Sequence, residues 1–347
     1  MPETTTAGAG LDAAVRSRIL GLTIRGASLA NVLRLLADET PLSPPLESAV
    51  AAEYERVATV LIDRDAYRTT TAEKAVWMMG VYRALAEQSG PYEIDTIDEL
   101  EPETFFRDYY FRNRPVKIAG FAKRWQSFAE WQVPSLLDRF GSQTVEVSTN
   151  RDAHETYDVD FEPTRREMIF SEFVAMLRAA ADRETNDFYL VARNLNVRRA
   201  FKPLVENLKP LPGVLSEHRA DYLNFWIGPR GTMTRLHHDL TNVLFCQLAG
   251  SKRMWFVPPH DTALVYNRLG VVAEADAARP NYKKHPLFRA ARVRDVTLDE
   301  GDAVLIPVGW WHQVQSLTES VSLTFINFAV PNLFAMTDQP HWRFRTD

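Results

Sequence analysis

Three residues of this chain, His237, Asp239 and His312, could together bind a transition metal. Two imidazoles and one carboxylate form the facial triad that leaves three positions open on a non-haem Fe(II) centre. Successive side chains of a strand point to opposite faces, so His237 and Asp239 share one face and His238 points away. We therefore expect His237, Asp239 and His312 to bind the metal, with His238 turned away from it.

The third candidate ligand must come from a second element. His312 lies far along the chain from Asp239 and follows residues 303–307, an apolar run that is typical of a buried strand. The two strands must then belong to one sheet or barrel. An isolated His-x-Asp occurs often by chance and is then usually a capping or hydrogen-bonding pair, so the surrounding motifs decide its interpretation.

Several motifs surround the three candidate ligands. Residues 236–242 read Leu-His-His-Asp-Leu-Thr-Asn, residues 247–253 read Gln-Leu-Ala-Gly-Ser-Lys-Arg, residues 301–307 read Gly-Asp-Ala-Val-Leu-Ile-Pro, residues 310–312 read Trp-Trp-His, and residues 324–328 read Thr-Phe-Ile-Asn-Phe. As an ordered set they resemble JmjC-type, cupin-fold oxygenases that use Fe(II) and 2-oxoglutarate, of the factor-inhibiting asparaginyl hydroxylase kind. The resemblance runs from about residue 114 to residue 332, most of the chain.

The resemblance implies roles for residues around the metal. His237, Asp239 and His312 would bind iron, as their types already suggest. Residues that match the co-substrate site of the family are Lys252, Thr234, Tyr189 and Asn327. Lys252 would pair with the distal carboxylate of 2-oxoglutarate, because a charge-assisted contact is about twice as strong as a neutral one. Thr234 and Tyr189 would hydrogen-bond that carboxylate, and Asn327 would lie near the metal.

Each of these four residues also has an ordinary structural interpretation. Lys252 could be a turn residue with its ammonium in solvent, as most lysines are. Thr234 could be an ordinary strand residue, Tyr189 a core aromatic, and Asn327 a turn or bulge residue. The structure must decide whether their side chains share a cavity with the three candidate ligands.

The family resemblance implies an enzyme that hydroxylates a C–H bond with O2 while 2-oxoglutarate becomes succinate and CO2. The leading substrate is an amino-acid side chain of a peptide or protein. A small molecule or natural-product intermediate is an alternative, because a fold does not fix its substrate. N-methyl demethylation begins with the same hydroxylation, although the sequence has no zinc-binding Cys/His cluster. A non-catalytic, metal-binding cupin is the alternative of another class.

Composition limits the partners and the compartment. The chain has 347 residues, with 40 basic and 45 acidic side chains and a net charge of −5. The sequence has no basic stripe of the kind that would predict nucleic-acid binding. Cys246 is the single cysteine, which suits a reducing compartment. No apolar stretch approaches a membrane span, and the N-terminus lacks the pattern of a signal peptide. We expect a cytoplasmic protein with no membrane partner, and a homodimer through the N-terminal helices stays open.

The chain divides by pattern into three parts. We expect residues 1–10 to be disordered and residues 11–90 to form a helical region, with helical periodicity clearest at residues 49–62 and 72–86. Prolines interrupt it at residues 41–46, and Gly90 and Pro91 end it. The apolar faces of these helices could pack on the barrel, form a dimer or bind a substrate protein.

Short strands and intervening helices follow from residue 91 to residue 347. This pattern of short strands and helices predicts a mainly β domain with helices, and with the family resemblance it indicates a double-stranded β-helix or jelly roll of the cupin and JmjC type. Residues 258–294 are less regular and could either line the mouth of the site or form a solvated loop. The side chains that would line the mouth are Tyr266, Arg268, Tyr282, Lys283, Lys284 and Phe288.

Overall fold

The structure is a computed structural model with two separate units. It describes residues 11–24, 28–37, 41–154, 157–158, 160–206, 208, 211, 213–216, 220–332 and 334. Contacts divide the chain into residues Met1–Leu85 and Ala86–Asp347, and each unit is treated by itself. The segment expected to be disordered, residues 1–10, lies outside the described residues.

The N-terminal unit is helical. It contains α1 (Ala13–Ile24), α2 (Leu29–Ala37) and α3 (Pro44–Gln88). Ile19, Val32, Leu36 and Val50 bring the three helices together in a small core. The two periodic segments at residues 49–62 and 72–86 belong to one continuous helix, which begins at a proline suited to a first turn and stops before Gly90.

The second half of α3 carries large apolar side chains that are exposed. They are Val76, Trp77, Met79, Tyr82 and Leu85. Packing of these side chains on the barrel, a homodimer through the N-terminal helices and binding of a substrate protein all stay predictions.

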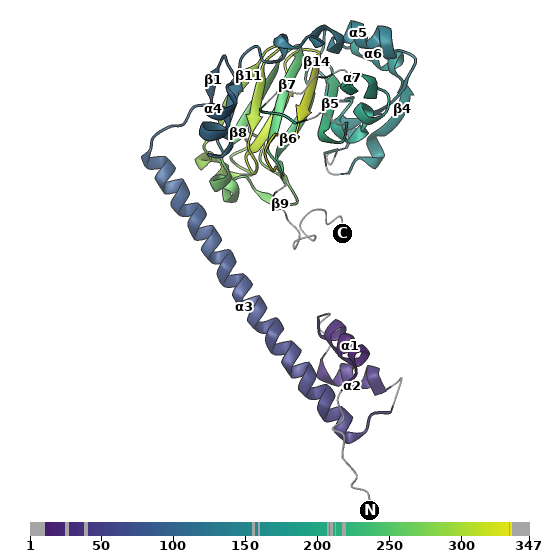
Figure 1. Ribbon diagram of the computed structural model, residues 1–347, viewed down its shortest axis with the longest axis vertical. Coiled ribbons are helices and arrows are strands. Elements are labelled where there is room, and N and C mark those ends of the chain that lie inside the picture. Colours follow the sequence, from purple (N-terminus) through teal and green to yellow (C-terminus); the bar gives the residue numbers. More distant parts are fainter. Residues whose placement is uncertain are drawn as a thin grey trace, which may run out of the picture. The chain divides into compact units, whose positions relative to one another are not determined.

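Two six-stranded sheets form the second unit (Figure 1). The first contains, in spatial order, β1 (Asp95–Ile97), β2 (Val116–Ile118), β12 (Ala303–Ile306), β7 (Val243–Ala249), β14 (Ser320–Phe325) and β5 (Leu223–Gly228). The second contains β11 (Arg294–Leu298), β8 (Lys252–Val257), β13 (Trp311–Ser316), β6 (Met233–His238), β10 (Val272–Ala273) and β9 (Asn267–Leu269). Only β1 and β2 pair in parallel among these neighbours. The expected double-stranded β-helix is confirmed.

Helices cover the outer face of the first sheet near β5 (Figure 1). They are α5 (Val133–Phe140), α6 (Phe170–Ala179) and α7 (Lys202–Glu206), and a two-stranded sheet of β3 (Thr144–Ser148) and β4 (Arg165–Ile169) lies in the same region. The short helix α4 (Pro102–Phe105) lies near β1 instead (Figure 1). The Phe225 ring of β5 lies 5.2 Å from Phe201 and 5.6 Å from Trp131. The alternation of β5 therefore turns Asn224 and Trp226 toward the other sheet.

A second core lies between the two sheets. The first sheet contributes Phe245 and Ile306, and the second contributes Phe256 and Val314. Cys246, the single cysteine, is fully buried on the helix-covered side of β7, and burial raises the pKa of its thiol. It is a core residue. None of the helices in the described residues is both long and apolar enough to cross a membrane.

Candidate active site

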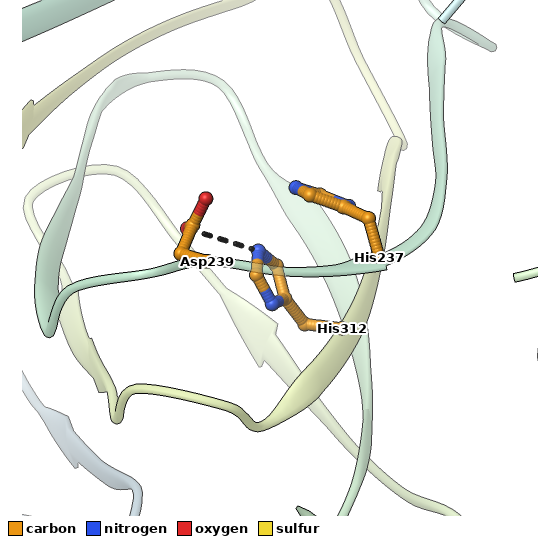
Figure 2. Close-up of side chains that lie close together, drawn as sticks. All are labelled: His237, Asp239 and His312. Atoms are coloured by element: carbon orange, nitrogen blue, oxygen red, sulfur yellow. Dashed lines mark ion pairs between the residues drawn. The ribbon is translucent and has the colours of Figure 1, made fainter. Parts of the chain in front are cut away.

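The structure brings His237, Asp239 and His312 together (Figure 2). His237 lies near the end of β6, Asp239 follows that strand, and His312 lies in β13 directly opposite His237. One potential ligand atom from each residue lies within 4.8 Å of the others. Nε2 of His312 is 3.6 Å from Oδ2 of Asp239. Two strands of one sheet thus supply the three groups, which is the arrangement that the spacing predicts.

Backbone carbonyls orient both imidazoles. Nδ1 of His237 lies 2.8 Å from the Arg235 carbonyl oxygen, and Nδ1 of His312 lies 3.0 Å from that of Trp310. Since a carbonyl only accepts, Nδ1 of each ring carries a proton, so Nε2 is the nitrogen that binds a metal in the neutral form of the ring. Burial lowers the pKa of His312 to about 3, which keeps its imidazole neutral. Two imidazoles and a carboxylate are ligands that fit a divalent transition metal.

His238 lies on the other face of β6. Its ring packs edge-on against Trp311 at 4.7 Å, and its Nδ1 is 3.2 Å from the Asp239 carbonyl oxygen. Burial lowers the pKa of this imidazole. His238 is absent from the group of candidate ligands, in agreement with strand alternation.

A cavity of about 350 Å³ contains the three candidate ligands. Lys252, Thr234 and Tyr189 line it as well. Lys252 is only 1% exposed, and its Nζ donates to the Tyr189 hydroxyl at 2.9 Å. Burial lowers the pKa of Lys252 to about 7, and no described carboxylate pairs with its ammonium. A dry ammonium without a protein counter-ion is suited to an anionic ligand, so these residues fit 2-oxoglutarate.

A β-bulge explains how Thr234 reaches the cavity. Three residues apart on a regular strand, Thr234 and His237 would face opposite sides. Between the pairs His312↔His237 and Val314↔Thr234, β6 advances by three residues while β13 advances by two. The extra residue of β6 turns Thr234 to the side of His237, as bulges beside functional sites often do.

Tyr189 is held against a glycine of β5. Its segment pairs with neighbouring strands through the isolated bridges Ser148↔Tyr189 and Leu190↔Ile227. A Cβ added at Gly228 would lie 2.5 Å from the Tyr189 ring, closer than any real contact. Burial also raises the pKa of the Tyr189 hydroxyl, which therefore stays protonated and can donate.

We expect Gly228→Ala to displace the Tyr189 ring and to weaken 2-oxoglutarate binding. Overpacking of this kind costs about 1–3 kcal/mol of unfolding free energy. Chemical denaturation and a 2-oxoglutarate titration would measure the two effects. Gly80→Ala is the control, since Gly80 lies in the helix α3 and a Cβ there meets no atom within 4 Å. An unchanged 2-oxoglutarate affinity in Gly228→Ala would show that the ring position does not matter.

Asn327 does not reach the cavity. Its Nδ2 donates to the Ser216 carbonyl oxygen at 2.9 Å, and the side chain is absent from the cavity wall. The expectation that Asn327 lies beside the metal is therefore corrected in favour of a turn-stabilising role. The polar side chains of the first sheet that do line the cavity are Asn224 and Thr324, whose Nδ2 and Oγ1 atoms are 3.5 Å apart.

The insertion at residues 258–294 contributes a glycine and two valines to the cavity rather than its basic and aromatic side chains. Gly270, Val271 and Val272, around the turn between β9 and β10, line the cavity. The side chains expected at the mouth lie elsewhere: Phe288 is buried with Trp311, Tyr266 packs on His285, and Tyr282, Lys283 and Lys284 are exposed. The placement of the Arg268 side chain lies outside the described residues.

Comparison with protein families agrees with the fold and with the site. The family model described as a cupin-like domain matches residues 102–332. The chain belongs to this cupin-like family. Among its relatives is a JmjC domain-containing protein of Dictyostelium discoideum, 32% identical over 106 residues, 29% of this chain and 24% of that protein. The resemblance to JmjC-type cupins is thereby confirmed.

Other relatives of this cupin-like protein carry names that describe oxidative or modifying enzymes. Lysine-specific demethylase 8 of Xenopus tropicalis is 28% identical over 63% of this chain and 49% of its own length. A bifunctional peptidase and (3S)-lysyl hydroxylase of Homo sapiens is 24% identical over 65% and 80%. A tRNA wybutosine-synthesizing protein of Gallus gallus is 25% identical over 67% and 76%. The chain spans about half the length of the first of these relatives.

Proposed function

We propose that this cupin-like protein is an Fe(II)- and 2-oxoglutarate-dependent oxygenase that hydroxylates a C–H bond. The observation that supports this most directly is the shared cavity, where His237, Asp239 and His312 converge and a buried Lys252 has no described carboxylate partner. Bound iron, 2-oxoglutarate and O2 would together supply the oxidising chemistry, as cofactors usually do.

The residues of the chain would bind and orient these groups. His237, Asp239 and His312 would hold the iron, and their backbone-bonded imidazoles need no reorganisation to do so. Lys252 would neutralise the distal carboxylate, with Tyr189 and Thr234 as hydrogen-bond donors. Apolar side chains from both sheets would keep water out: Val243, Phe245, Ile306, Val314 and Ile326.

For the substrate we propose an amino-acid side chain of a peptide or protein. The names of the relatives, a lysine-specific demethylase and a lysyl hydroxylase, support this class. A small molecule or a natural-product intermediate is the second candidate, because a fold does not fix its substrate. Demethylation of an N-methyl group would use the same site. A cytoplasmic location and the absence of membrane and nucleic-acid partners belong to this proposal.

The decisive experiment is an anaerobic titration of the full chain with Fe(II) and 2-oxoglutarate, followed by air and quantitation of succinate. We expect a metal-dependent complex that forms succinate slowly alone and faster with a substrate. Peptide pools and small-molecule pools would then be compared for stimulation. A protein that binds iron but neither binds nor consumes 2-oxoglutarate would instead be a non-catalytic, metal-binding cupin.

A further inference from the structure

Two charged side chains lie on the wall of the cavity besides those proposed to bind iron or 2-oxoglutarate. Arg235 belongs to β6, two residues before His237, and its side chain is 35% exposed. Asp158 comes from the segment between the 3-10 helices Arg151–Ala153 and Glu162–Thr164, and its side chain is 14% exposed. Both can therefore contact a molecule that enters the cavity beside the candidate iron ligands.

The main chain of β6 fixes the Asp158 carboxylate. Its Oδ2 accepts from the Arg235 N–H at 3.0 Å, and Nε of Arg235 lies 3.9 Å from the same oxygen. Its Oδ1 faces Arg151, whose Nη2 is 3.8 Å away, beyond hydrogen-bond distance. Oδ1 of Asp158 can therefore accept a hydrogen bond from a ligand. Burial raises the pKa of the Asp158 carboxyl, and the charge of Arg151 opposes that rise.

Arg151 is a fixed positive charge behind this carboxylate. Its guanidinium is 2% exposed, donates to the Met233 carbonyl oxygen at 2.7 Å and lies over the Tyr157 ring at 4.3 Å. It does not line the cavity. A cation bound at Asp158 would therefore meet the positive charges of both Arg151 and Arg235, and their repulsion is strong in a cavity that is partly shielded from water.

We propose that Asp158 and Arg235 bind an amide group of the substrate and disfavour a lysyl or arginyl side chain. The carboxamide of Asn or Gln offers an N–H donor and a C=O acceptor side by side, which match the Asp158 carboxylate and the Arg235 guanidinium. The N–H and C=O of one residue in an extended main chain also point to the same side, so the amide groups bound here are either those of an extended main chain or a carboxamide of Asn or Gln. This inference rests on the proposed oxygenase function and deepens it, because it sets this chain apart from relatives named for lysine substrates.

The test measures the binding of three peptide pools to the full chain, loaded anaerobically with Fe(II) and 2-oxoglutarate. The pools are blocked nonapeptides with random flanks and a central Leu, Gln or Lys. We expect the Lys pool to bind the wild type most weakly. Arg235→Gln should raise the affinity for the Lys pool relative to the Gln pool by about tenfold, because it removes one positive charge from the cavity wall.

The sources of the amide are distinguished within the same experiment. Equal affinities of the Leu and Gln pools would assign a main-chain peptide group, and tighter binding of the Gln pool would assign a side-chain carboxamide. Three results would overturn the proposal: tightest wild-type binding of the Lys pool, an unchanged Lys-to-Gln ratio in Arg235→Gln, or no binding of any pool.

Two controls separate this subsite from the rest of the site. Arg230→Gln removes an exposed arginine that pairs with Glu184 and does not line the cavity, so the pool ratios should stay as in the wild type. Arg235→Lys keeps the charge and should keep the discrimination against the Lys pool. The visible absorption of the Fe(II)–2-oxoglutarate complex is recorded throughout. Its absence in the wild type would contradict the proposed function, whereas its presence without discrimination would contradict only the subsite.

Discussion

His237→Ala should abolish succinate formation and weaken Fe(II) binding at least about 100-fold, while His238→Ala should keep the metal. The two histidines are neighbours of the same type on β6, yet only His237 belongs to the group of candidate ligands. His238 packs against Trp311 on the opposite face. The two variants therefore test whether the direction of the side chain, and not the residue type, decides metal binding.

Anaerobic Fe(II) titration followed by metal analysis of the desalted protein would measure this difference. Thermal unfolding of both variants without metal controls for stability, because each variant loses a ring contact, that of His237 with His312 or that of His238 with Trp311. Equal iron affinity in the two variants would refute the assignment of His237 as a ligand. Loss of iron in both variants, with intact folding, would contradict the assignment of only one face of β6 to the metal site.

The candidate ligands could be predicted from the sequence because their geometry is local. Alternation on one strand separates His237 and Asp239 from His238, and the apolar run before His312 identifies the second strand. The order of the surrounding motifs along the chain resembles that of the JmjC-type family, and this resemblance indicated the candidate co-substrate residues. Lys252 shows the limit of this reasoning, because its burial depends on the contact with Tyr189 from a segment far away in sequence.

Asp158 and Asn224 could not be predicted in the same way. A hydrogen bond from the main-chain N–H of Arg235 holds Asp158 at the cavity, across a sequence separation of 77 residues. No motif in the sequence around Asp158 predicts that contact. Asn224 carries a weak signal, since it and Trp226 alternate with three buried apolar residues of β5. Asn327 fails for the opposite reason: its motif matched, but its amide is bonded to Ser216.

The helical region shows a third kind of limit. Residues 63–71 are polar and contain three consecutive threonines, so propensity favours a break between the two periodic segments. The helix α3 nevertheless continues through them, because residues 63–71 contain neither a proline, which would remove a hydrogen-bond donor, nor a glycine. Sequence periodicity identified the two ends of this helix but could not show that they are joined.

Lys252→Met should raise the dissociation constant of 2-oxoglutarate about 100-fold, corresponding to about 3 kcal/mol, because the substitution keeps the volume and removes the charge. The same variant should have a more stable apoprotein, since burial of an ammonium without a described carboxylate partner opposes folding. Arg253→Met is the matched control, because Arg253 is the next residue of β8 but is exposed and pairs with Asp295. Similar losses of affinity in both variants would contradict a specific role of Lys252.

The pH dependence of 2-oxoglutarate binding tests the same ammonium in the wild type. Burial lowers the pKa of Lys252 to about 7, whereas the unfolded chain has the ordinary value near 10.5, so the apoprotein should become more stable as the pH rises from 7 toward 10.5. Ligand binding has the opposite sign, because only the protonated amine pairs with a carboxylate. Above pH 7 the affinity should fall about tenfold per pH unit.

Calorimetry at pH 8 in two buffers with different ionisation enthalpies should detect uptake of nearly one proton on binding, and this uptake should be absent in Lys252→Met. A pH-independent affinity between pH 7 and pH 9 would show that Lys252 is already charged in the apoprotein, and that its burial is relieved by water in the cavity.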